Sequence, residues 1–288
     1  MNTIALAKTY TGLLDEVYQQ SALTAVLESD ATLARAGANA NEIVIPKLSM
    51  DGLADYDRNS GYTSGKVDLS WETVKFNYER GRSFSVDNMD NEETQNIAFG
   101  RLAGEFIRTK VVPELDAFRF ATYAGIEGVG SATGALATGE AVIGALRTAT
   151  SEMDEAEVPM EDRHLFITPT LLGLVQDLDT NKSREVLSRF ASITKVPQTR
   201  FYSAIELLDG KSSGEEKGGF KKATAGVELN FEIVHKPAVL QFTKHAVPKI
   251  ISPEVNQDAD AWKYGYRNYG LCDAYENKAA GIYIHKKA

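Results

Sequence analysis

Hydrophobic positions near the N-terminus recur three and four residues apart. Over residues 9–28 this spacing gathers leucine, valine and tyrosine on one side, which predicts an amphipathic helix. Small residues dominate 34–41, a stretch that includes Gly37, so we expect a flexible connection after the helix.

A β-rich segment with a polar middle follows. Residues 42–48 are rich in β-branched side chains and predict a strand, whereas 51–65 are polar with few apolar side chains. Alternation of apolar and polar positions starts at Val67 and restarts out of phase at Val74, which suggests a bulge or a bend. Residues 43–78 therefore predict a two-stranded ribbon. Such a ribbon is marginal in water by itself, so it must lie on this subunit or on another one.

Helical patterns occupy the middle of the chain. The longest covers 91–123, where Pro113 should kink the helix or divide it in two. A glycine-rich connector at 125–139 leads to a second expected helix at 140–157. A short buried strand is then expected at 165–167, where three large apolar residues follow one another.

The second half of the chain adds more strands. Thr168 and Pro169 have the residue types of a helix cap and first turn. Residues 210–226 are rich in glycine, lysine and serine and predict a mobile surface loop, while the alternation over 227–233 predicts a half-buried strand. Further strands are expected at 250–252, 262–266 and 281–285. Strands separated by long helices, with no repeated β-α-β order, predict an α+β fold.

The charge balance argues against a protein that grips nucleic acid by its phosphates. The 288 residues include 31 lysines and arginines against 40 aspartates and glutamates, so the formal net charge is −9. The basic residues are scattered, whereas phosphate binding needs a concentrated basic face. The balance does fit a surface that lies near DNA without adhering to it, since like charges repel.

Cysteine content and the N-terminus indicate where the chain is made. Cys272 is the single cysteine, so no internal disulfide and no thiolate metal cluster can form, which fits a reducing cytoplasm. Residues 1–11 lack the segments of a signal peptide, and no apolar run reaches the ~20 residues that span a bilayer. We therefore expect a soluble chain, made in the cytoplasm, with no membrane contact.

We expect no functional motif for catalysis, for cofactor binding or for metal binding. The glycines of 125–130 follow a helix and not a strand, so they predict a loop instead of a dinucleotide site. Residues 210–212 resemble the end of a phosphate loop, but Ile205 stands where its first glycine should be. The four histidines lack metal-ligand spacing, and the aspartates of 258–273 miss the EF-hand pattern. The aromatic stripe at 262–269 is expected in a sheet core or a subunit interface rather than stacked on bases.

Five segments, taken in order, are similar to one known family. They are residues 41–53 (NEIVIPKLSMDGL), 71–87 with WETVKFNYERGR and FSVD, 91–124 with FGRLAGEF and VPELD, 165–169 (LFITP) and 276–283 (ENKAAGIY). Together they resemble the major capsid proteins of tailed double-stranded DNA phages, whose fold is shared with herpesvirus shells and encapsulins. None of the segments is a catalytic motif.

The resemblance implies a division of the chain into four parts within an α+β capsid fold. Residues 1–40 would be an N-terminal arm and 41–80 an extended β-hairpin loop. Residues 81–130 and 251–288 would form a peripheral domain around a long spine helix, and 131–250 an axial domain.

The resemblance also implies partners and a location. Copies of the chain would form hexamers and pentamers that close into an icosahedral virion shell around double-stranded DNA, without sequence-specific binding. Assembly would take place in the host cytoplasm with a portal protein. Because the chain begins almost directly at the arm, a separate scaffolding protein is implied.

The ribbon is the expected contact between subunits, since a thin apolar ribbon can bury its face on a neighbour and such contacts close into rings. The side chains expected at this interface are Tyr56, Asp57, Arg58, Tyr62, Lys66, Leu69, Trp71, Arg80 and Arg82. Two alternatives stay open: an encapsulin-type nanocompartment shell, and an enzyme whose site is assembled from distant positions.

Overall fold

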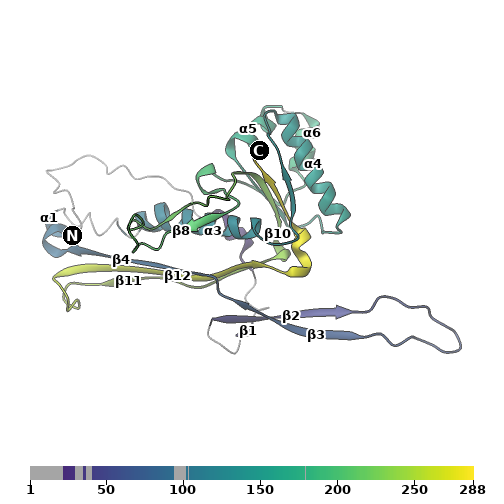
Figure 1. The fold of residues 1–288 in the computed structure, drawn as a ribbon, viewed down its shortest axis with the longest axis horizontal. Coiled ribbons are helices and arrows are strands. Elements are labelled where there is room, and N and C mark those ends of the chain that lie inside the picture. Colours follow the sequence, from purple (N-terminus) through teal and green to yellow (C-terminus); the bar gives the residue numbers. More distant parts are fainter. Residues whose placement is uncertain (1–21, 30–34, 37–40, 94–101, 103, 179) are drawn as a thin grey trace.

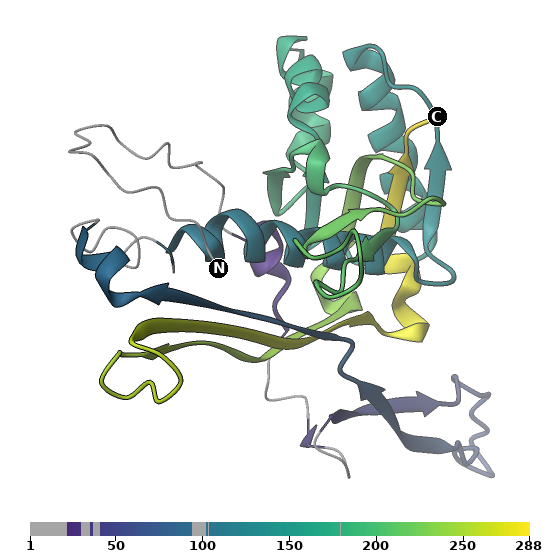
Figure 2. The ribbon, with the colours of Figure 1, turned by 60° about the vertical axis from the view of Figure 1, so that its left-hand side comes forward.

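The computed structural model describes residues 22–29, 35–36, 41–93, 102, 104–178 and 180–288. These residues form three parts in Figure 1: an upper lobe of helices around a sheet, a long flat sheet beneath a helix, and a narrow ribbon. Figure 2 views the molecule from another side and shows the ribbon projecting clear of both other parts. The mixture of helices and sheets confirms the predicted α+β class.

A five-stranded sheet forms the centre of the upper lobe. Its strands, in spatial order, are β5 (Gly130–Thr133), β13 (Ile282–Lys286), β10 (Leu229–His235), β6 (Arg163–Ile167) and β7 (Ser192–Lys195). The central strand β10 runs antiparallel to both of its neighbours. The two edge strands, β5 and β7, each pair in parallel. The last strand of the chain therefore lies between strands from much earlier positions.

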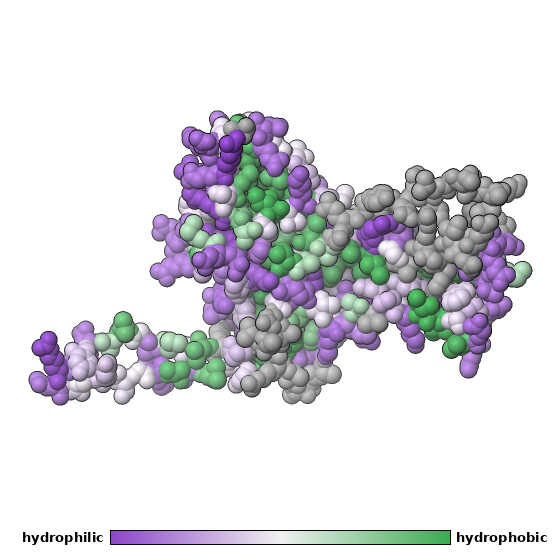
Figure 3. Space-filling model, turned by 180° about the vertical axis from the view of Figure 1, so that it is seen from behind, coloured by the Kyte–Doolittle hydropathy of each residue, from purple (hydrophilic) through white to green (hydrophobic). Residues whose placement is uncertain are grey.

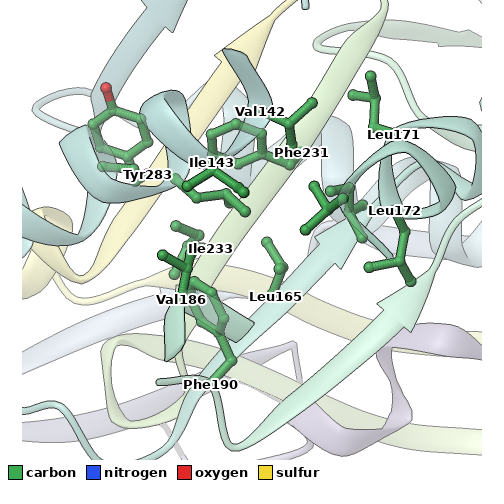
Figure 4. Close-up of a cluster of buried hydrophobic side chains, with 14 of the residues drawn as sticks. Val142, Ile143, Leu165, Leu171, Leu172, Val186, Phe190, Phe231, Ile233 and Tyr283 are labelled. Carbon is green, nitrogen blue, oxygen red and sulfur yellow. The ribbon is translucent and has the colours of Figure 1, made fainter. Parts of the chain in front are cut away.

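Helices cover both faces of this sheet. One face carries α4 (Gly139–Glu155), α5 (Pro169–Asp177) and α6 (Asn181–Leu187), and the other carries α3 (Val112–Ala124). On the first face, Val142 of α4 joins Leu165 and Phe231 of the sheet in one buried cluster (Figure 4). On the second face, the rings of Phe120 and Phe166 meet edge to face at 5.1 Å between centroids. The lobe thus has three layers.

A three-stranded antiparallel sheet extends sideways from the lobe. Its strands, in spatial order, are β11 (Val239–Ile251), β12 (Ala261–Ala274) and β4 (Tyr78–Asp87). Helix α3 and the π-helical turn before it, η3 (Ile107–Val111), lie along one face of this sheet (Figure 1). On that face the ring of Phe106 packs edge to face against Phe84 and Tyr264.

The ribbon consists of two long strands and one short one. Strands β2 (Glu42–Met50) and β3 (Val67–Lys75) pair along their whole length, and β1 (Arg35–Ala36) pairs with the base of β2. The predicted two-stranded ribbon with a polar middle is confirmed. Of the predicted bulge or bend, the bulge is wrong, because the β2–β3 register has no shift. The break comes later, at 76–77, where the chain leaves the ribbon and enters β4.

The remaining described elements are short. They are η1 (Leu23–Leu27), α1 (Asn88–Glu93), η4 (Gln198–Arg200), β8 (Ile205–Leu207), β9 (Phe220–Lys222), η5 (Lys236–Ala238) and η6 (Glu276–Gly281). Two of them revise the sequence-based expectations. Of the helix predicted over 9–28, only 22–28 are described, and there the chain forms the 3-10 helix η1. The loop predicted over 210–226 contains β9, which pairs with β8.

The helix and strand predicted over 140–167 agree with the structure. The helix expected over 140–157 is α4, and the buried strand expected at 165–167 is β6. Within 91–123, the residues 94–101 and 103 lie outside the described part. The helical path continues through Pro113 because the preceding turn widens to the π form and accommodates a ring that would crowd an α-helix. The connector expected at 125–139 contains the edge strand β5, which the sequence analysis missed.

Strand β10 is buried on both faces, so the prediction of a half-buried strand is wrong. Its polar residue Glu232 lies on the face that α3 covers, where the sequence led us to expect contact with water. Glu232 lies there between Phe166 of β6 and Ile284 of β13, fully buried. Neither of its carboxyl oxygens has a hydrogen-bond partner among the described residues. Burial raises the pKa of Glu232 well above its ordinary value, because an apolar surrounding favours the neutral form of the carboxyl group.

This carboxyl makes the stability of the subunit depend on pH. In the unfolded chain Glu232 ionises above pH ~4.3, whereas in the folded chain it stays protonated to higher pH, so stability is lost as the pH rises. The variant Glu232→Gln cannot ionise. Its free energy of unfolding should therefore exceed that of the original chain at pH 8 and approach it toward pH 4. The difference should grow by up to about 1.4 kcal/mol per pH unit, measured by urea unfolding at several pH values. A constant difference across this range would contradict a buried neutral carboxyl.

Candidate assembly surface

The outer half of the ribbon has one apolar face. In an antiparallel pair, directly opposite residues share a face, and the register pairs Pro46 with Trp71, Leu48 with Leu69, and Met50 with Val67. We call the five large members of this face the apolar stripe: Leu48, Met50, Val67, Leu69 and Trp71. Each is exposed, from 45% for Trp71 to 67% for Val67. Figure 3 shows hydrophobic residues recurring along the projecting ribbon.

The base of the ribbon is apolar on the opposite face. Ile43, Ile45 and Val74 are buried there against Leu240 and Leu271 of the long sheet. Farther out, that same face carries polar positions such as the pair of Ser49 and Asp68. The apolar side of the ribbon therefore changes between base and tip. This change explains the phase slip in the sequence, since the register itself is continuous.

The ribbon concentrates exposed apolar surface to an unusual degree. Most of the exposed large hydrophobic side chains among the described residues lie on the ribbon or at its tip. Besides the apolar stripe, these are Leu53, Tyr56 and Tyr62. A contiguous exposed apolar patch on a folded chain marks an interaction surface. No described element of the same chain covers the stripe in Figures 1 and 2.

The tip of the ribbon is held by short local contacts. The Asp57 carboxylate accepts hydrogen bonds from the backbone amides of Asn59 at 2.6 Å and Ser60 at 3.3 Å. The rings of Tyr56 and Tyr62 lie 4.8 Å apart between centroids. Where the tip joins the strands, Asp51 accepts from the amide of Lys66 at 2.7 Å. The tip is thus a small ordered turn that presents two tyrosines and several charges.

The structure groups seven of the nine predicted interface residues. Those on the ribbon and its tip are Tyr56, Asp57, Arg58, Tyr62, Lys66, Leu69 and Trp71. The other two lie on β4 and point toward α3. Arg80 donates to Glu114 of α3 at 2.7 Å and to the carbonyl of Leu208 at 2.7 Å. Arg82 donates to the carbonyls of Glu216 at 2.9 Å and Lys217 at 3.0 Å, so both arginines hold the loop before β9 within this chain.

A buried polar network, which the sequence analysis missed, attaches the N-terminal segment to the body. Asp116 of α3 is fully buried and accepts hydrogen bonds from the amides of Leu23 and Thr24 and from the Thr24 hydroxyl at 2.8 Å. It also pairs with the buried Arg200 at 3.1 Å. Arg119, one turn along α3, donates to the same Thr24 hydroxyl at 2.9 Å. The one signal of this network in the sequence was Asp116, an acidic residue inside the apolar pattern of the spine helix.

Further contacts extend this network to β11. Glu28 pairs with Arg119 and accepts from the amide of Thr243 at 2.8 Å. The amide of Ser29 donates to the carbonyl of Gln241 at 2.9 Å, and Gln241 donates back to the carbonyl of Thr24 at 2.8 Å. Residues 22–29 are therefore joined to α3 and to the long sheet at once.

The aromatic stripe at 262–269 is divided between two faces of the long sheet. Tyr264 is fully buried beneath Phe106, and Tyr266 packs against the same ring. Tyr269 lies on the opposite face and stacks on Phe76 at 4.8 Å between centroids. The prediction of a sheet core holds for Tyr264, whose ring is closed to a stacking base.

Two features of the described residues bear on catalysis. They contain no group of three or more histidine, cysteine, aspartate or glutamate side chains placed to hold a metal ion. Burial raises the pKa of the Cys272 thiol to about 12, so the thiolate that would act as a nucleophile is scarce. Among the helices described, none has the length and apolar character to cross a membrane.

Comparison with known proteins gives the fold. No protein-family model matches the sequence, and no curated protein matches it. Solved phage capsids match the structure over almost its whole length. A Mycobacterium phage Che8 structure has a TM-score of 0.62 at 11% identity, with 99% of this chain and 98% of the other covered. The mature capsid of bacteriophage PhiM1 gives 0.65 at 10% identity, with 98% and 92% covered.

This chain has the tailed-phage major capsid fold. The capsid of cyanophage P-SCSP1u agrees, with a TM-score of 0.64 at 13% identity and 98% and 93% of the two chains covered. Because coverage is nearly complete, the ribbon, the long sheet and the upper lobe are all parts of the capsid fold. A virus-like particle from Pyrococcus furiosus is less similar, with a TM-score of 0.52, 10% identity, and 83% and 86% covered.

Loss of the buried Asp116 carboxylate should release the N-terminal segment from the capsid fold. In Asp116→Asn, the side-chain amide can accept fewer of the hydrogen bonds that converge at this position. The buried Arg200 also loses its charge partner. Breaking a buried pair in this way costs about 3–5 kcal/mol. We expect a lower melting temperature and faster proteolysis within residues 22–29. The exposed Asp55→Asn at the ribbon tip is the control and should change neither. Equal behaviour of the two variants would refute the anchoring role.

Proposed function

We propose that this chain is a major capsid protein whose copies assemble, as hexamers and pentamers, into a closed icosahedral shell around double-stranded phage DNA. The observation that supports it most is the uncovered apolar stripe on a ribbon that projects from a phage capsid fold. Burying the stripe of one copy on another stabilises the contact by about 25 cal/mol for each Å² of apolar surface removed from water. The virion capsid would be the location of the protein, after assembly in the host cytoplasm.

The position of the stripe favours the assembly of several copies into a ring. It lies on a narrow projection, whereas the body offers quite different surfaces (Figure 3). A contact between one copy's projection and a different surface of the next copy is heterologous, and a heterologous contact closes into a ring when its rotation allows. Within this proposal the interface uses Tyr56, Asp57, Arg58, Tyr62, Lys66, Leu69 and Trp71. Arg80 and Arg82 support it from inside the subunit by holding their loop.

The four parts of the capsid proposal follow the chain. Residues 1–40 would be the arm, 41–80 the extended loop, 81–130 with 251–288 the peripheral domain, and 131–250 the axial domain. Within this proposal β13 would belong to the axial domain, since it pairs with β10. A separate scaffolding protein and a portal protein would be the assembly partners, and the net charge of −9 suits a shell that encloses DNA without binding its sequence.

A shell that encloses proteins instead of DNA, as encapsulins do, has weaker support. The phage capsids align with 98–99% of this chain, against 83% for the Pyrococcus furiosus particle. The solved structures that match are structural capsid proteins, which also speaks against an enzyme.

Electron microscopy of the purified protein, alone and co-expressed with its genomic neighbours, tests the proposal. Uniform isometric shells, or tubes with a capsid lattice, are the expected result. Their contents would then distinguish DNA from a protein cargo. A monodisperse monomer or small oligomer under all of these conditions would refute shell formation.

Substitution of neighbouring residues on β3 tests the apolar stripe. Leu69→Asp places a charge in the stripe and should abolish closed shells, since burying an unpaired carboxylate costs several kcal/mol. The subunit should remain folded, because Leu69 is exposed. Ser70→Asp, on the opposite face, is the matched control and should assemble normally. Circular dichroism and size-exclusion chromatography with electron microscopy give both readouts. Normal shells from Leu69→Asp would exclude the stripe from the interface.

A further inference from the structure

Two short helical turns join the upper lobe to the long sheet. The chain passes from β10 to β11 through η5, and it returns from β12 to β13 through η6. In Figure 1 the yellow turn η6 lies where the lobe meets the end of the long sheet. The two turns are bonded to each other, since the Lys278 ammonium of η6 donates to the carbonyl of Pro237 in η5 at 3.1 Å. We call η5, η6 and His235, the residue before η5, the joint.

His235 is enclosed by both turns of the joint and is only 7% exposed. Gly281, at the end of η6, packs very closely here. A Cβ atom added to it would lie 2.6 Å from the Cβ of Ala238 in η5 and 3.4 Å from the Cβ of His235. Because a tightly packed interior transmits local changes, a new charge or a new water molecule at this imidazole acts on both turns at once.

The groups that face His235 carry more positive than negative charge. The pairing of β10 with β6 places it directly opposite Arg163, whose side chain is fully buried. Burial and, after it, the charge of Arg163 lower the pKa of His235 below its ordinary value. Asp162, in the turn before β6, opposes this effect. Lys278 of η6 and His164 of β6 strengthen it.

The second histidine, His164, is buried on the neighbouring strand. Its Nδ1 lies 2.7 Å from the hydroxyl of Ser192, and its Nε2 has no hydrogen-bond partner among the described residues. Burial lowers the pKa of His164 as well, with Asp162 opposing and Lys236 of η5 assisting. Two imidazoles are therefore held in the neutral form beside the joint, with one carboxylate, Asp162, in reach of both.

The turn before β6 is fixed to the joint in a strained conformation. Asp162 has a φ of 56°, in the left-handed region that residues other than glycine rarely adopt. Its carbonyl accepts from the amide of Lys236 at 3.0 Å, which ties the turn to η5. Arg163 donates to two carbonyls of the same turn and pairs with Asp154 of α4 at 2.7 Å. Strained backbone persists only where its surroundings hold it, so the turn depends on a closed joint.

We propose that the joint is an acid-sensitive hinge, in which protonation of His235 loosens the contact of η5 with η6 and frees the upper lobe to move on the long sheet. An imidazolium at this position would be buried beside the cations of Arg163 and Lys278. A buried charge without a sufficient partner is destabilising, and opening of the joint admits water to the ring. The proposal goes beyond shell formation, because every contact in it lies within one subunit.

The direction of the effect follows from proton linkage. In an open joint His235 would ionise near its ordinary pKa of ~6.5, whereas in the closed joint its pKa is lower. Below pH ~6.5 the open form binds more protons than the closed form, so the closed form loses stability as the pH falls. Between the two pKa values, one such histidine raises the population of the open form by up to about tenfold per pH unit.

Hydrogen–deuterium exchange of the full chain, read by mass spectrometry at about pH 7.5 and about pH 5.5, tests the hinge. After correction for the intrinsic exchange rate, peptides that contain η5 and η6 should lose protection in acid by up to about tenfold per pH unit. His235→Gln cannot take up a proton there and should retain most of this protection. His245→Gln is the matched control, since His245 is exposed on β11, and should open as the original chain does. Equal loss in His235→Gln and in the original chain, or no loss in either, would overturn the proposal.

Two charge variants keep the test valid if His235→Gln does not fold. Asp162→Asn removes the opposing carboxylate, and asparagine tolerates the left-handed backbone of this position. Lys278→Gln removes a cation but leaves an N–H group that can donate to Pro237, on a side chain that is exposed. The loss of protection in acid should be larger in Asp162→Asn and smaller in Lys278→Gln. Shifts in the same direction, or no shift in either variant, would mean that the histidine charge does not control the joint.

Discussion

A two-stranded ribbon has two faces, and its own subunit can cover only part of them. Here the long sheet buries the base of the ribbon through Ile43, Ile45 and Val74. Beyond that base the apolar residues move to the other face, where Leu48 and Leu69 remain exposed. Because the register is continuous, this change is encoded in the order of residues and not produced by a distortion of the strands. The ribbon is therefore built for two different surfaces, and one of them is not in the subunit.

A projection can serve as a contact only if the body holds it in a fixed direction. Helix α3 provides this rigidity, because it packs on the five-stranded sheet through Phe120 and on the long sheet, which in turn buries the ribbon base. Two buried carboxyl groups near this helix behave differently. Asp116 is surrounded by donors and joins the N-terminal segment to the body, whereas Glu232 has no partner among the described residues and is kept neutral by burial.

Local patterns in the sequence predicted those elements whose environment is set by nearby residues, including α4, β6 and the ribbon. The errors arose where distant segments decide the outcome. β10 has the alternation of a half-buried strand, yet α3, more than a hundred positions earlier, covers its polar face. The ribbon residues of the candidate surface were predicted because exposed apolar alternation is visible in sequence. The role of Arg80 was not, because its partners Glu114 and Leu208 come from two other parts of the chain.

Glycine illustrates why assembly surfaces escape sequence analysis and emerge from a single folded subunit. In the sequence, Gly81, Gly265 and Gly270 are equivalent small residues within strands. The structure separates them, because an added Cβ would strike backbone at Gly81 and Gly270 but only touch Lys249 at Gly265. A glycine that the subunit itself does not require can therefore be recognised only in the folded chain, where the neighbours of an added Cβ are known.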